Sequence, residues 1–121
     1  MALARRLERF DRFASSNLLE AELRAAFARE KVGLAGDLFD WMKWVLPERP
    51  LTPELERAFA GGYLQGADAW HLACALYIAE EPGKLAFLTL DRRQRAVARQ
   101  LGFRSGVGKD PAFLATVELT K

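Results

Sequence analysis

Residues 66–94 read GADAWHLACALYIAEEPGKLAFLTLDRRQ, and this stretch decides the fold class. Its first part, residues 67–80, has almost no polar face, which predicts a helix that is buried nearly all round. Its second part, residues 85–90 (LAFLTL), is apolar on both faces. Such a strand suits a parallel sheet that helices cover on both sides. The stretch therefore predicts an α/β sandwich with a central, mainly parallel sheet.

Further elements lie on either side of this stretch. The periodicity of apolar residues predicts helices over residues 2–9, 17–31, 38–45, 52–61 and 91–101. Thr52 is expected to cap one of these helices, with Pro53 in its first turn. Extended segments are expected at residues 12–15 and 115–120. Because repeats, low-complexity tracts and linkers are absent from the sequence, we expect a single domain over residues 1–121.

Composition limits the possible classes of protein. The 121 residues carry a net charge of +2, which is too mild to indicate a nucleic-acid partner by itself. The single cysteine, Cys74, lies in the apolar helix pattern, so we expect it to pack as a small hydrophobe in a reducing compartment. The longest stretch without a charged residue is 11 residues, residues 69–79, against the ~20 of a membrane span. We therefore expect a cytoplasmic protein with no membrane segment.

Two aspartates flank the apolar helix and strand. Asp91 begins the sequence DRRQ, a capping-box pattern, and Asp68 lies in a first helical turn where the helix dipole favours an acid. Both therefore have a purely structural explanation. However, Asp68 leads a helix that is expected to be buried, where an unpaired charge is costly. Asp91 follows a strand, and ligands of parallel sheets bind outside the carboxyl ends of the strands.

Helix geometry indicates different roles for two glutamates of the helix predicted at residues 17–31. Glu20 suits a capping box behind Asn17 and has Arg24 one turn ahead, which indicates a structural role. Glu22 instead projects from the apolar stripe of the same helix. Clustered carboxylates are natural ligands of Mg²⁺ or Mn²⁺, ions that favour hydrolysis of phosphodiesters. Convergence of Glu22, Asp68 and Asp91 on one ion is therefore the functional hypothesis.

Other polar residues leave two interpretations open. His71 shares a helical face with Asp68, and a lone histidine on an apolar helix is more often a packed, hydrogen-bonded core residue than a ligand. Arg92, Arg93 and the two arginines that follow them line the last helix. They form either a solvated face or a track for RNA phosphates.

Several motifs together resemble one known family. The bacterial PIN-domain proteins, the VapC-type toxin ribonucleases, are similar to residues 15–23 (SSNLLEAEL), 67–73 (ADAWHLA), 87–91 (FLTLD), Gln94, Ala98 and 101–103 (LGF). The resemblance implies a three-layer α/β/α fold, Mg²⁺- or Mn²⁺-dependent endoribonuclease activity on RNA, an antitoxin partner and frequently a homodimer. It implies that Glu22, Asp68 and Asp91 are the metal-binding and catalytic acids. Thr89 matches a small hydroxyl residue that supports the last acid.

The amino-terminal end departs from the family pattern. Family members begin with an apolar strand that ends in an aspartate and occupies the middle of the sheet, and nothing before Phe10 resembles it. We therefore expect slow or undetectable RNA cleavage, or a natural start that lies upstream. The alternative is a non-catalytic PIN-like module that binds protein or RNA. The gap in the sheet is expected to be filled by the amino-terminal segment, by residues 115–120 or by a second chain, and a dimer is favoured.

Overall fold

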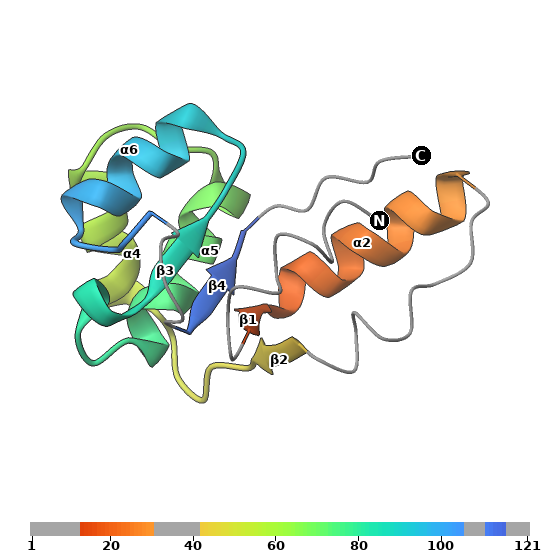
Figure 1. Cartoon of the computed structure of the whole chain (residues 1–121), viewed down its shortest axis with the longest axis horizontal. Helices are drawn as coiled ribbons and strands as arrows, with labels where there is room; N and C mark the ends of the chain where they lie inside the picture. The colour runs from red at the N-terminus through yellow and green to blue at the C-terminus, as the bar shows by residue number, and fades with distance from the viewer. Residues whose placement is uncertain (1–12, 31–41, 106–110, 116–121) are drawn as a thin grey trace.

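The computed structural model of the chain describes residues 13–30, 42–105 and 111–115. Its centre is a sheet of four parallel strands in the order β2-β1-β4-β3 (Figure 1). The strands are β1 (Phe13–Ser16), β2 (Met42–Val45), β3 (Ala86–Leu88) and β4 (Ala112–Leu114). The α/β fold class with a central parallel sheet is therefore confirmed.

Helices cover both faces of the sheet, so the fold has three layers. On one face α2 (Asn17–Glu30) packs Leu19, Leu23 and Phe27 against Met42 of β2 and Leu114 of β4. On the other face lie α4 (Thr52–Ala60), α5 (Gly66–Ile78) and α6 (Arg92–Gln100), on the opposite side of the sheet from α2 (Figure 1). A short 3-10 turn, η1 (Pro82–Lys84), leads from this layer into β3.

The long apolar helix is buried as its sequence predicts. Seven residues of α5 are buried, and the helix packs against both α4 and β1. Cys74 is among them, and burial raises the pKa of its thiol to about 12. The cysteine is thus a core hydrophobe, as expected. In the described segments of the chain, no helix is long and apolar enough to cross a membrane.

The predicted helix at residues 38–45 is wrong over its second half. Met42–Val45 is strand β2, which pairs in parallel with β1 in the register Phe13↔Met42. Met42 faces α2 and Val45 faces the α4–α5–α6 layer. Pairing with β1 and burial from both sides override the helical spacing of the sequence. Residues 38–41 and the predicted helix at residues 2–9 lie outside the described residues.

Smaller corrections concern the ends of two elements. Thr52 does not cap α4, since the cap position is Leu51 and no side chain bonds the free amides there. The structure also has a strand that was not predicted, β4 at Ala112–Leu114; of the predicted strand at residues 115–120, Ala115 lies just past β4, and residues 116–120 lie outside the described part. A proline and a glycine-rich stretch before β4 hid this strand from the sequence pattern.

Strand β4 fills the middle of the sheet. It pairs with β1 on one side (Phe13↔Ala112) and with β3 on the other (Phe87↔Phe113). The ring of Phe113 is fully buried and stacks on Phe87 with 5.6 Å between ring centroids. The central place that the sequence left open is therefore occupied by the carboxy-terminal part of the same chain. A second chain is not needed to close this gap, so the reason for favouring a dimer does not hold.

Candidate functional site

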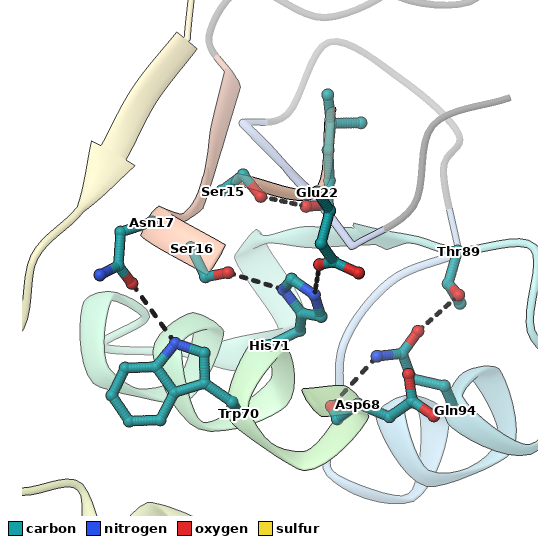
Figure 2. Close-up of polar contacts among 10 residues, drawn as sticks. Ser15, Ser16, Asn17, Glu22, Asp68, Trp70, His71, Thr89 and Gln94 are labelled. Atoms are coloured by element: carbon teal, nitrogen blue, oxygen red, sulfur yellow. Dashed lines mark hydrogen bonds and ion pairs between the residues drawn. The ribbon is translucent and has the colours of Figure 1, made fainter. Parts of the chain in front are cut away.

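The candidate acids lie around the carboxyl ends of the strands. Strand β1 runs directly into α2, which carries Glu22, and Asp91 follows shortly after β3. Asp68 is in the first turn of α5, whose residues pack against β1. Figure 2 shows Glu22 above and Asp68 below His71, with Gln94 joined to Asp68 and Thr89 joined to Gln94. Three separate elements thus bring acidic residues to one region.

Asp91 is the cap of α6, as its sequence pattern predicts. Its Oδ1 accepts a hydrogen bond from the backbone N–H of Gln94 at 2.8 Å. The hydroxyl of Thr89 accepts a bond from the backbone N–H of Asp91 at 3.0 Å and donates to Gln94 Oε1. Thr89 therefore holds the loop that carries Asp91, while its support of a metal-binding acid stays a prediction.

Gln94 joins this loop to the neighbouring helix. Its side chain is completely buried, and Nε2 donates to the backbone carbonyl oxygen of Asp68 at 3.1 Å. Because the same amide accepts from Thr89, both of its ends are bonded. The start of α5 and the start of α6 are consequently fixed to one another, together with Asp68 and Asp91.

Asp68 is electrostatically close to the other two acids. Partial burial raises the pKa of its carboxyl group, and the negative charges of Asp91 and Glu22 raise it further, while His71 acts in the opposite direction. Like charges that are brought together at the edge of a core are unfavourable for folding and are typical of functional sites. The charges of Asp91 and Glu22 therefore act on Asp68, which is less than the expected convergence of the three acids on one ion.

Glu22 is held by a buried histidine. The carboxylate is half exposed, and its Oε1 lies 3.0 Å from Nε2 of His71, whose side chain is only 3% exposed. Nδ1 of the same ring lies 2.7 Å from the hydroxyl of Ser16, at the end of β1 (Figure 2). Glu22 was expected on the core side of α2, and it lies instead at the margin, with one oxygen turned to the protein.

His71 is the buried, hydrogen-bonded residue that its sequence position predicts. Burial is the largest influence on its pKa and lowers it, against the opposing effect of Glu22 and Asp68. A carboxylate can only accept hydrogen bonds, so Nε2 carries the proton that faces Glu22. In the neutral ring Nδ1 then accepts from Ser16. Sequence analysis did not assign any role to Ser16, and the serine pair at the strand end was the available signal.

A shallow pocket lies beside Asp68 and Asp91. Its volume is about 340 Å³, and it is lined by Tyr63, Leu64, Gln65, Asp68, Asp91, Arg92 and Arg93. Arg92 and Arg93 are exposed there, as a phosphate track requires. Arg95 instead donates to the backbone oxygen of Thr89 at 2.9 Å, and Arg99 lies at a different pocket. Tyr63, which is 73% exposed, is a member of the pocket that sequence analysis missed.

The acids do not form a ready metal site. Their hard carboxylate oxygens are the right donors for Mg²⁺ or Mn²⁺. Yet among residues 13–30, 42–105 and 111–115 no three Asp, Glu, His or Cys side chains lie where they could hold an ion together. One oxygen of Glu22 faces His71, and one oxygen of Asp91 caps a helix. The described residues therefore do not fit a divalent ion as they stand.

The chain was also compared with known proteins. No family model, no curated protein and no solved structure matches it.

Proposed function

We propose that the chain is a PIN-type ribonuclease domain that binds RNA at this edge of the sheet and whose cleavage is impaired. The observation that carries the proposal is the position of Asp68, a partly buried carboxylate whose pKa is raised by burial and by Asp91 and Glu22. A structural role does not require such a cluster, because a first-turn acid serves the helix dipole equally well when it is solvated. The cluster therefore favours a chemical role.

The neighbouring pocket supports RNA as the ligand. Two exposed guanidinium groups, those of Arg92 and Arg93, suit phosphate oxygens. Tyr63 offers an exposed aromatic face on which an unpaired base can stack. Both lie within one pocket with the two aspartates, so a bound strand passes the acids that are proposed to act on it.

We infer that RNA cleavage is impaired from the residue at the end of the central strand. The residue after β4 is Ala115, which is buried and whose backbone N–H bonds the carbonyl oxygen of Leu88. An alanine supplies no carboxylate at this place. With Glu22 and Asp91 also engaged in protein hydrogen bonds, we propose that any divalent ion binds weakly and that RNA cleavage is slow.

One observation favours the non-catalytic alternative. Because the described residues do not form a metal-holding arrangement, a module that binds RNA through the same pocket without cleaving it is the second candidate function. It differs from the first candidate in one respect, which is turnover. It predicts RNA binding that depends on Arg92 and Arg93 and no cleavage in any divalent ion.

A binding and cleavage assay tests both candidates. Single-stranded RNA is mixed with the purified 121-residue chain in Mn²⁺ or in EDTA, and both binding and product are measured. Slow, Mn²⁺-dependent cleavage that Asp68→Asn abolishes supports the ribonuclease. Binding without product supports the module. Absence of binding by the wild-type chain contradicts both, and Arg57→Gln, an exposed arginine on α4 outside the pocket, is the control for a general loss of charge.

The resemblance also leads us to propose two protein partners. An antitoxin that covers the acidic edge should protect RNA from the chain, and titration with candidate acidic or basic peptides in the cleavage assay tests this. A homodimer is tested by light scattering at micromolar concentration. Neither partner is required to complete the described part of the sheet.

A further inference from the structure

We propose that Ser16 and His71 form a buried hydrogen-bonded unit that fixes one tautomer of the imidazole and thereby positions the carboxylate of Glu22. His71 is then a positioning residue for the acidic cluster. The arrangement itself follows from contacts of the described residues. Its consequence for catalysis rests on the proposed function.

The unit is built from three elements that the fold brings together. Ser16 is the last residue of β1, Glu22 lies on α2 and His71 on α5. Ser16 is 0% exposed and His71 is 2% exposed, so water cannot replace either partner. The two hydrogen bonds, of 2.7 Å and 3.0 Å, occupy both ring nitrogens. Each nitrogen therefore has one defined role.

The direction of the bonds fixes the tautomer. The Glu22 carboxylate must accept, so Nε2 donates, and the hydroxyl of Ser16 must then donate to Nδ1 of the neutral ring. In the other tautomer, Nδ1–H would donate to the hydroxyl oxygen of Ser16. Nε2 would then carry no proton to donate to Glu22. Glu22, which can only accept, thus selects the tautomer, and the Ser16 hydroxyl supplies the donor that the remaining nitrogen needs.

A positioned Glu22 differs from a free surface glutamate. A glutamate side chain that is fixed in one rotamer loses conformational freedom, and half of this side chain is exposed. A bond to a charged acceptor offsets that loss, because it is stronger than a neutral hydrogen bond. One carboxylate oxygen is held by His71 and half of the side chain stays exposed, so the second oxygen can face a cation or a developing charge.

A serine-hydrolase relay is excluded by burial. The hydroxyl of Ser16 is completely enclosed, so no substrate atom can reach it. In a nucleophilic triad the serine must be open to the substrate. Among Ser16, His71 and Glu22, the group that solvent and ligands can reach is therefore the carboxylate and not the hydroxyl.

The imidazole can be observed directly, because His71 is the single histidine of the sequence. We expect the ¹⁵N spectrum of the tag-free chain at neutral pH to show a protonated Nε2 and an unprotonated Nδ1. In Ser16→Ala the Nδ1 resonance should shift because Nδ1 loses its donor, and in Glu22→Ala the Nε2 resonance should shift and the tautomer preference should weaken. The proposal would be overturned if the wild-type ring is the Nδ1–H tautomer, an even mixture of tautomers, or charged. It would also be overturned if the resonances do not change in Glu22→Ala.

Cleavage by two His71 variants tests the consequence. Glutamine can still donate an N–H toward Glu22, whereas leucine cannot. If the domain cleaves RNA, His71→Leu should lower kcat by roughly 10- to 100-fold with KM nearly unchanged, and His71→Gln should restore most of the rate. Equal loss in both variants overturns the positioning role. If the wild-type chain does not cleave RNA at all, the proposed function fails, and the ¹⁵N spectra still decide the proposal about Ser16 and His71.

Discussion

The side-chain amide of Gln94 donates a hydrogen bond to the backbone carbonyl oxygen of Asp68, across 3.1 Å and 26 residues of sequence. Through this bond the first turn of α6 is fastened to the first turn of α5. The same amide accepts from Thr89, so the loop after β3 is included. The relative position of Asp68 and Asp91 therefore depends on a residue that carries no charge.

Gln94→Met should destabilise the domain. The substitution keeps the volume and removes both side-chain hydrogen bonds, so the carbonyl oxygen of Asp68 and the hydroxyl of Thr89 each lose the bond to Gln94. We expect a loss of about 1 to 3 kcal/mol in the free energy of unfolding, measured by urea denaturation. Gln100→Met, the same change at an exposed position of α6, should cost less than about 0.5 kcal/mol. Equal costs would contradict the joining role of Gln94.

Asp91→Ala and Asp91→Asn separate the cap from the charge. Alanine removes the acceptor for the Gln94 N–H, so we expect a loss of roughly 0.5 to 2 kcal/mol. Asparagine caps helices nearly as well, so its effect on stability should be small. Any RNA cleavage should nevertheless be lost in both variants. Retention of cleavage in a folded Asp91→Asn chain would show that Asp91 is a cap and nothing more.

Asp68→Asn should stabilise the chain at neutral pH. The raised pKa of Asp68 means that the folded state resists ionisation of this group, so its charge lowers stability above the raised pKa. As the pH falls through that value toward the ordinary aspartate pKa of about 3.9, the wild type regains this stability. We therefore expect a gain of about 1 kcal/mol or less at pH 7 that disappears near pH 4, measured by thermal unfolding. A variant that is less stable at pH 7 contradicts the like-charge cluster.

Arg92→Gln and Arg93→Gln should weaken RNA binding in a salt-dependent way. Each arginine that contacts a phosphate contributes about one unit to the slope of log K against log salt concentration, somewhat less for single strands. Each variant should reduce the slope by roughly that amount, measured by fluorescence anisotropy. Tyr63→Ala should reduce affinity by about 1 to 3 kcal/mol without a change in slope. A slope that neither arginine alters places the RNA elsewhere.

Phe113→Ala tests the central position of β4. Removal of a fully buried ring that stacks on Phe87 should cost about 3 to 5 kcal/mol. Since β4 belongs to the same chain, this loss should be the same over a 100-fold range of protein concentration, whether or not the chain dimerises. A loss that changes with concentration would show that a second chain contributes to the fold.

The sequence predicted those elements whose pattern is local. The buried helix α5 and the strand β3 could be identified because burial on all sides leaves no polar face in either. Strands β2 and β4 could not be identified in this way. They have four and three residues, too few to show a periodicity, and their extended form depends on pairing with β1. The central place of β4 depends on contacts between residues about 100 positions apart, which spacing does not encode.

The candidate site was predictable in part for the same reason. The cap at Asp91 and the Glu20–Arg24 ion pair lie within one turn of helix, and both are present. The place of Glu22 at the margin depends on His71, 49 positions away, and the pocket residue Tyr63 has no sequence signal beyond its aromatic ring. Proximity of the acids required the tertiary structure.

The position of β4 also affects how the chain folds during synthesis. Strands β1 and β3 have no ladder with one another in the described sheet, and each is paired with β4, which follows both in the sequence. A ribosome therefore releases two halves of a sheet before it releases the strand that joins them. Contacts of such high sequence separation slow folding, and the unpaired edges of β1 and β3 are exposed in the meantime. Protection of these edges by a chaperone should matter most in the interval before residues 112–114 emerge.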